Sequence, residues 1–365
     1  MLARIAAAIE DAGGWIGFEA YMAMALYTPG LGYYSRGDRQ FGLMPASGSD
    51  FVTAPEMSPL FGRALARQVA QALQVSGTHE VWEFGAGSGA LAAQLLGELG
   101  ERISHYTIVD LSGTLRERQR QTIETQQPTL AHKVRWLDTL PERFDGVVVA
   151  NELLDAMPVT LLHFDGAHWQ ERGVALAPGS AAAGAPRLVF ADRPTRLSPP
   201  VDQSWPTGAV VELPRVAVAY MFTLAERLAR GAAFFIDYGF PEREFYHPQR
   251  SQGTLMCHRA HRADTDPLAD PGDKDITAHV DFTAIAVAAQ DAGMEVLGYT
   301  SQARFLFNCG LIDDMEKADL RGQAMAQKLI TEHEMGELFK VLGVASAGLT
   351  FDAIGFAAGD RSHAL

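Results

Sequence analysis

The chain contains 365 residues, 47% of them hydrophobic and 20% charged, which is the composition of an ordinary globular protein of one large domain with insertions or of two domains. Its 44 acidic and 30 basic side chains give a net charge of −14, which argues against nucleic acid as the main partner because such binding depends on neutralising phosphates. No apolar run reaches the ~18 residues of a membrane span, and the two cysteines offer neither metal-ligand spacing nor a disulfide framework. We therefore expect a cytoplasmic protein with no metal site and no membrane insertion.

Residues 1–75 are expected to form an N-terminal helical and lid segment. Helical patterns are followed by a polar, glycine-rich loop over residues 41–58, and long loops in compact proteins are often lids or binding loops. Thr53 and Glu56 lie near the end of this loop, before a helix that begins near Ser58. Helix-entry capping accounts for both residues, but their position also makes them candidates for contacts with a cofactor.

Residues 81–91 are the most informative stretch, because an apolar strand there leads through three alternate glycines into a helix. Gly85, Gly87 and Gly89 lack a Cβ, so the backbone can turn sharply and a ligand can lie against the main chain. The following helix directs its N-terminal amides toward that ligand. A glycine loop alone is compatible with NAD, FAD, S-adenosylmethionine or a tight turn that binds nothing.

Two acids favour S-adenosylmethionine, and residues 76–158 are therefore expected to be its binding half of an α/β domain. Glu83 lies two residues before the first glycine, where it would repel a dinucleotide pyrophosphate but attract an ammonium and a sulfonium. Asp110 closes a second apolar strand 21 residues after Gly89, a distance that suits hydrogen bonds to ribose hydroxyls. Asp138 follows a third strand at residues 134–137 and could meet an adenine edge, although surface turn chemistry explains it nearly as well.

A second group of polar residues follows the buried strand predicted at residues 144–150. Ligands in open parallel sheets bind outside the carboxyl ends of the strands, so Asn151 and Glu152 should face the cofactor. Asp155 comes three residues after Glu152 and would share its face if a helix began there.

The second half of the chain is expected to combine an excursion with the rest of the sheet. Residues 159–215 contain strand-like pieces and a hairpin signal at Asp165-Gly166, which predict an antiparallel flap for a macromolecular substrate or mere decoration. Residues 216–365 should complete the α/β domain, with a helical insertion at about 313–343 and a last strand at 351–357. The alternation of strands and helices predicts a doubly wound, mostly parallel sheet.

Five motifs occur in the order found in a known family. They are residues 50–58, the glycine turn at 83–89, residues 151–158, Asp237-Tyr238-Gly239 and residues 275–282. Together they resemble the MidA family of S-adenosylmethionine-dependent methyltransferases, from about Ile16 to the end of the chain, and the chain is similar to bacterial-type members. The resemblance implies a class I methyltransferase fold, with Glu83, Gly85, Gly87, Gly89 and Asp110 around S-adenosyl-L-methionine and with Asn151 and Glu152 at the reacting end. Mitochondrial members are known as arginine methyltransferases that assist assembly of respiratory complex I, so the resemblance implies a protein substrate such as a complex I subunit.

The expected reaction is methyl transfer to a guanidinium nitrogen of a partner protein, which depends on in-line positioning and on the local field. Glu152 and Asp155 could hold the guanidinium and help to localise a lone pair. His279 is a candidate proton acceptor, although a lone histidine is more often structural. Three alternatives stay open: a nicotinamide-linked oxidoreductase, an assembly chaperone that keeps the cofactor fold without catalysis, and a methyltransferase acting on a small metabolite.

Overall fold

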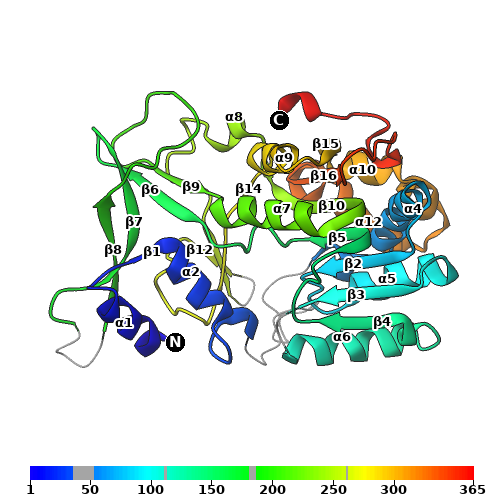
Figure 1. The fold of residues 1–365 in the computed structure, drawn as a ribbon, viewed down its shortest axis with the longest axis horizontal. Helices are drawn as coiled ribbons and strands as arrows, with labels where there is room; N and C mark the ends of the chain where they lie inside the picture. Colours follow the sequence, from blue (N-terminus) through cyan, green and yellow to red (C-terminus); the bar gives the residue numbers. More distant parts are fainter. Residues whose placement is uncertain (36–52, 111–112, 181–185, 260–261) are drawn as a thin grey trace. The chain divides into compact units, whose positions relative to one another are not determined.

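The computed structural model describes residues 1–35, 53–110, 113–180, 186–259 and 262–365 (Figure 1). They form two compact units. The first is built from Met1–Asp38, Asp155–Val218 and Phe240–Asp281, and the second from Arg39–Leu154, Ala219–Gly239 and Phe282–Leu365. Each unit therefore joins segments that are far apart in the sequence. The first three residues of the motif at 50–58 lie outside the described part of the chain.

A twisted sheet forms the centre of the second unit, with strands in the order β15-β16-β10-β5-β2-β3-β4. Neighbouring strands from β10 to β4 are parallel, whereas β16 is antiparallel to both β10 and β15. This arrangement confirms the predicted doubly wound, mostly parallel α/β fold. The strands are β2 (Glu80–Phe84), β3 (His105–Val109), β4 (Val134–Leu137), β5 (Phe144–Asn151), β10 (Leu228–Phe240), β15 (Glu295–Ser301) and β16 (Phe339–Ala345).

Helices cover both faces of this sheet, as adjacent residues of β10 illustrate. Phe234 packs against Phe305 of α10 with ring centroids 6.4 Å apart, whereas Phe235 lies 6.3 Å from Tyr220 of α7 on the opposite face. Both phenylalanines are fully buried, as expected for a strand covered on two sides. The helices of this unit are α3 (Ala54–Met57), α4 (Pro59–Ser76), α5 (Ala90–Leu99), α6 (Gly113–Gln126), α7 (Arg215–Arg227), α9 (Phe282–Asp291), α10 (Gln302–Asn308), α11 (Leu311–Lys317) and α12 (Leu320–Ile330).

Two predictions for the end of the chain were wrong. The helical segment after α10 does not extend to residue 343, because residues 339–345 form the fully buried strand β16. Residues 351–357 contain a short 3-10 turn at Ile354–Phe356 instead of the last strand. The ring of Phe356 fills the space beside Gly298 and Gly343, where a Cβ would come within 2.2 and 2.7 Å of it. The segment at 351–357 is therefore apolar because it covers the sheet, not because it extends it.

The first unit is built around an antiparallel sheet in the order β1-β7-β6-β9, in which β8 pairs with β7. Asp165 forms the predicted hairpin turn between β6 and β7, where its Oδ1 accepts the backbone N–H groups of Ala167 and His168. A second, three-stranded sheet has the order β12-β11-β13. The elements are α1 (Leu2–Asp11), β1 (Ile16–Gly17), α2 (Phe18–Tyr27), β6 (Thr160–Phe164), β7 (Trp169–Leu176), β8 (Leu188–Pro194), β9 (Val210–Leu213), α8 (Glu242–Phe245), β11 (Met256–Arg259), β12 (Arg262–Asp264), β13 (Asp275–Thr277) and β14 (Val280–Asp281).

The helices in the described ranges do not include one with both the length and the apolar character required to cross a bilayer.

Candidate active site

The glycine turn joins β2 to α5 at the carboxyl edge of the parallel strands. Gly85, Gly87 and Gly89 have φ values of +68°, +51° and +82°, a left-handed backbone region that other residues rarely adopt. A Cβ on Gly89 would also lie 2.9 Å from Cα of Gln119, so this position has no room for a side chain. The turn thus presents bare main chain before the N-terminus of α5, a cradle that suits a ligand at close range.

Glu83 lies on β2, two residues before this turn, and is almost fully buried. The hydroxyl of Tyr106 on the neighbouring strand β3 donates to its Oε2 at 2.8 Å. Burial raises the pKa of Glu83 to about 8; the hydrogen bond from Tyr106 opposes this shift, and the negative charge of Asp110 adds to it. The hydrogen bond to Tyr106 holds the Glu83 side chain against the neighbouring strand, while its contact with a cofactor stays a prediction.

Asp110 is held beside the glycine turn by a residue that the sequence reasoning missed. Gln119 of α6 is fully buried, and its Nε2 donates to Oδ2 of Asp110 at 2.8 Å and to the carbonyl oxygen of Gly87 at 3.2 Å. Its Oε1 accepts the indole N–H of Trp136 at 2.9 Å. Gln119 therefore ties the predicted ribose-binding acid to the predicted cradle.

The sequence does contain a signal for this role. Leu115, Gln119 and Ile123 lie at four-residue steps on α6 and are all buried, so Gln119 is a polar residue within an apolar helix stripe. A buried amide requires partners for both its donor and its acceptor.

Asp138 lies farther out, with 75% of its side chain exposed, and forms an ion pair with Arg116. The Nε of Arg116 also donates to the carbonyl oxygen of Asp110 at 3.1 Å, so the arginine connects the ends of the two strands. The exposure and the ion pair of Asp138 fit its interpretation as a surface residue. Its contact with an adenine edge stays a prediction.

Asn151 is the last residue of β5 and Glu152 follows it, at the same end of the parallel strands as the glycine turn. Nδ2 of Asn151 donates to Oε1 of Glu152 at 3.0 Å, and because a carboxylate only accepts, this bond fixes which end of the amide is the oxygen. Asn151 is about nine-tenths buried, and its Oδ1 has no hydrogen-bond partner among the residues that the structure describes. A buried acceptor of this kind is costly unless a ligand donates to it. The cradle and this acceptor both fit a nucleoside cofactor that carries amino and hydroxyl donors.

Thr53 and Glu56 lie at α3. Thr53 is the N-cap residue of α3, but its side chain makes no capping hydrogen bond. Nε2 of Gln94 donates to the carbonyl oxygen of Pro55 at 2.7 Å, which holds α3 against α5, the helix that follows the glycine turn. Both residues therefore lie on an element packed beside the cradle, and their contacts with a cofactor stay predictions.

Asp155 and His279 belong to the first unit, so the geometry of the second unit does not include them. The carbonyl oxygen of Asp155 accepts the N–H of Ala278 at 2.9 Å, which places the two predicted residues on adjoining segments. The ring of His279 stacks on Phe240 at 5.3 Å with an interplanar angle of 6°, and its backbone N–H donates to Oγ1 of Thr254. These contacts fit a structural histidine, and the role of His279 as a proton acceptor stays a prediction.

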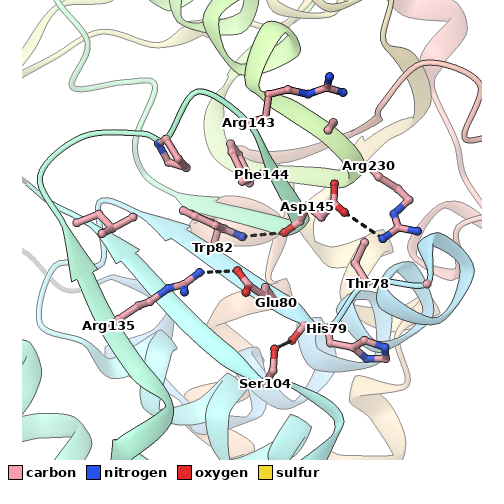
Figure 2. Close-up of a pocket in the computed structure, with 14 residues that line it drawn as sticks. Thr78, His79, Glu80, Trp82, Ser104, Arg135, Arg143, Phe144, Asp145 and Arg230 are labelled. Atoms are coloured by element: carbon pink, nitrogen blue, oxygen red, sulfur yellow. Dashed lines mark hydrogen bonds and ion pairs between the residues drawn. The ribbon is translucent and has the colours of Figure 1, made fainter.

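A large cavity of about 820 Å³ lies at the other edge of the sheet in the second unit (Figure 2). Its lining includes Glu80 and Phe144, the first residues of two parallel strands, whereas the glycine turn follows the last residue of β2. Figure 2 shows Arg135 beside Glu80 and Arg230 beside Asp145, pairs whose N–O distances are 2.6 and 3.0 Å. This cavity is therefore distinct from the glycine cradle.

Comparison with known proteins identifies the family. The family model of S-adenosyl-L-methionine-dependent methyltransferases named Methyltransf_28 matches residues 64–300, which is more than half of the chain. The chain belongs to this family. A COG1565 superfamily protein from Burkholderia thailandensis, solved with bound S-adenosyl-homocysteine, is 53% identical over 100% of this chain and 96% of its own, with a TM-score of 0.94. S-adenosyl-L-methionine is accordingly the cofactor, and the chain is a methyltransferase.

Two curated relatives carry a more specific name. The mitochondrial protein arginine methyltransferase NDUFAF7 of Danio rerio is 29% identical over 91% of this chain and 84% of its own length. The Mus musculus protein of the same name is 28% identical over 87% of this chain and 78% of its own.

Proposed function

We propose that this protein transfers a methyl group from S-adenosyl-L-methionine to a guanidinium nitrogen of an arginine in a partner protein. The observation that carries the proposal is the pair formed by Asn151 and Glu152, which offers a carbonyl oxygen and a carboxylate at the carboxyl end of β5. The Glu152 carboxylate accepts hydrogen bonds on two oxygens, so it suits the N–H fork of a guanidinium better than a substrate carboxylate. The names of the curated relatives support an arginine acceptor.

The residues of the second unit have separate roles in this reaction. Gly85, Gly87 and Gly89 leave room for the cofactor against the main chain, and Asp110 accepts hydrogen bonds from its ribose. The cofactor supplies an electrophilic methyl group. As the acceptor nitrogen forms its bond to carbon and the carbon–sulfur bond breaks, the guanidinium loses one proton, and Glu152 is the proposed acceptor for it. Asn151 holds the cofactor through its carbonyl oxygen, which has no hydrogen-bond partner among the described residues.

The partner and the remaining catalytic residues are also part of the proposal. Asp155 and His279 stay proposed catalytic residues on the basis of the sequence motifs, and a subunit of respiratory complex I is the proposed protein substrate on the basis of the family resemblance. The cytoplasm is the proposed location, because Cys257 and Cys309 are free and buried, as is usual in a reducing compartment.

Isotope labelling tests the acceptor directly. The purified protein is incubated with a host lysate and S-adenosyl-L-methionine carrying a deuterated methyl group, and the labelled residue is located by tandem mass spectrometry. We expect label on arginine, and label on a small molecule, on lysine or on no product would contradict the proposal.

A matched variant then tests the role of Glu152. Glu152→Gln keeps the size of the side chain and an acceptor for Asn151, but it cannot take up a proton. Methyl transfer should fall by about 100-fold, while affinity for S-adenosyl-homocysteine should stay within about threefold of the native value. Equal losses of transfer and affinity would place Glu152 in cofactor binding instead.

A further inference from the structure

The backbone at Glu152 is held in an unusual conformation. Its φ is +53°, and among the residues that the structure describes only Asp270 shares a positive φ without being glycine. A residue with a Cβ occupies this region only when its surroundings compensate for the strain, and such residues concentrate at functional sites. The N–H of Glu152 donates to the carbonyl oxygen of Ile236 on β10 at 2.8 Å, which provides one compensating bond.

Asp237 provides two more such bonds from the end of β10. Its side chain is almost fully buried, and Oδ2 accepts the backbone N–H groups of Leu153 at 3.1 Å and Leu154 at 2.9 Å. The other oxygen, Oδ1, accepts the N–H of Tyr238 at 2.9 Å. One carboxylate oxygen therefore fixes the two residues that follow the strained position.

The segment that follows Glu152 also contacts the glycine turn. A Cβ built on Gly85 would lie 3.0 Å from Cδ1 of Leu153, so the side chain of Leu153 rests against the glycine turn. A displacement of the Leu153 backbone would consequently move both the side chain over Gly85 and the adjoining Glu152. Leu153 is therefore held by Asp237 and also contacts the glycine turn.

We propose that Asp237 is a positioning residue for the reaction. Its carboxylate holds the amides of Leu153 and Leu154, keeps Glu152 in the left-handed conformation that directs its side chain, and fixes Leu153 against the cradle. Only a side chain that accepts on both oxygens satisfies the amides of Leu153, Leu154 and Tyr238 together. An asparagine at this position would present its NH₂ group to one of these N–H donors. The inference rests on the proposed role of Glu152.

A comparison of Asp237→Asn in two backgrounds tests this inference. Calorimetry measures the affinity for S-adenosyl-homocysteine in the native chain, in Asp237→Asn, in Glu152→Gly and in the double variant. Asp237→Asn should weaken binding about tenfold, the equivalent of roughly one net hydrogen bond. Glycine adopts a positive φ without strain, so in the Glu152→Gly background the same change should weaken binding by less than about threefold.

Two controls separate positioning from simple loss of structure. Asp145→Asn changes an exposed aspartate of β5 at the opposite edge of the sheet and should leave affinity unchanged. Hydrogen exchange of the peptide containing residues 151–156 should speed up in Asp237→Asn and recover in the double variant. If the Asp237→Asn chain does not fold, Asp237→Glu replaces it, because this change keeps the carboxylate but shifts it by one methylene.

An equal loss of affinity in both backgrounds would overturn the inference, as would unchanged affinity in Asp237→Asn. These measurements need no methyl acceptor. If arginine is not the methyl acceptor, the calorimetric result for Asp237 still stands. If the calorimetric test fails, the labelling experiment still decides whether arginine is methylated.

Discussion

Replacing Glu83 with glutamine removes an ionisable group from beneath the glycine turn while keeping the size of the side chain and an acceptor for the Tyr106 hydroxyl. In the native chain, burial raises the pKa of Glu83 from 4.5 to about 8. The folded chain therefore holds a proton there at neutral pH that the unfolded chain releases.

The sign and size of the effect follow from this difference. Because folding favours the protonated form, the stabilising contribution is complete below pH 4.5 and is lost as the pH rises toward 8. Each pKa unit corresponds to ~1.4 kcal/mol. The difference between the pKa of 4.5 in the unfolded chain and about 8 in the folded chain therefore corresponds to at most ~5 kcal/mol of unfolding free energy. Relaxation around the ionised group reduces this upper bound.

Urea unfolding at pH 5.5, 7.0 and 8.5 measures the effect. Relative to Glu83→Gln, the native chain should lose several kcal/mol of stability between the lowest and the highest pH. Glu117→Gln is the control, since Glu117 is an exposed residue of α6 and its replacement should leave the native pH dependence unchanged. Parallel pH profiles for the native chain and Glu83→Gln would refute the assignment of Glu83 as a buried carboxyl group that is protonated at neutral pH.

Three further substitutions test the cradle and its surroundings. Gly87→Val places a β-branched side chain at a φ of +51° and should abolish binding of S-adenosyl-homocysteine in calorimetry; retained binding would contradict the cradle. Gln119→Leu removes the hydrogen bonds that Gln119 makes to Asp110 and to the Trp136 indole N–H, and should lower stability by ~1–3 kcal/mol and affinity for S-adenosyl-homocysteine by about tenfold; native values for both would contradict a role of Gln119 in the site. Arg230 lines the cavity at the opposite end of the strands, so Arg230→Ala should leave the affinity for S-adenosyl-homocysteine within about twofold of the native value. A large loss of affinity would indicate that the ligand binds in that cavity.

The parallel strands and the glycine turn could be predicted from the sequence because both depend on local patterns. Alternate glycines after an apolar strand predict a sharp turn, and the structure shows all three in the left-handed region. The run Val147-Val148-Val149 predicts a strand buried on both faces, which β5 is.

Long-range pairings could not be predicted in the same way. Nothing local shows that the first 38 residues belong with residues 155–218 and 240–281 in one unit. β16 was missed because its neighbouring helices suggested a longer helical insertion, and its partner strands are β10 and β15, more than thirty residues away in sequence. The partners of Gln119 and Asp237 likewise become visible only when the chain is folded, since each side chain binds backbone from another element.

A crystal structure of this protein with S-adenosyl-homocysteine tests the central claim most directly. We predict that the ligand lies over Gly85 and Gly87, with its ribose hydroxyls hydrogen-bonded to Asp110 and a donor group within hydrogen-bond distance of Oδ1 of Asn151. Ligand in the cavity lined by Arg135 and Arg230, with the glycine turn bare, would contradict the account.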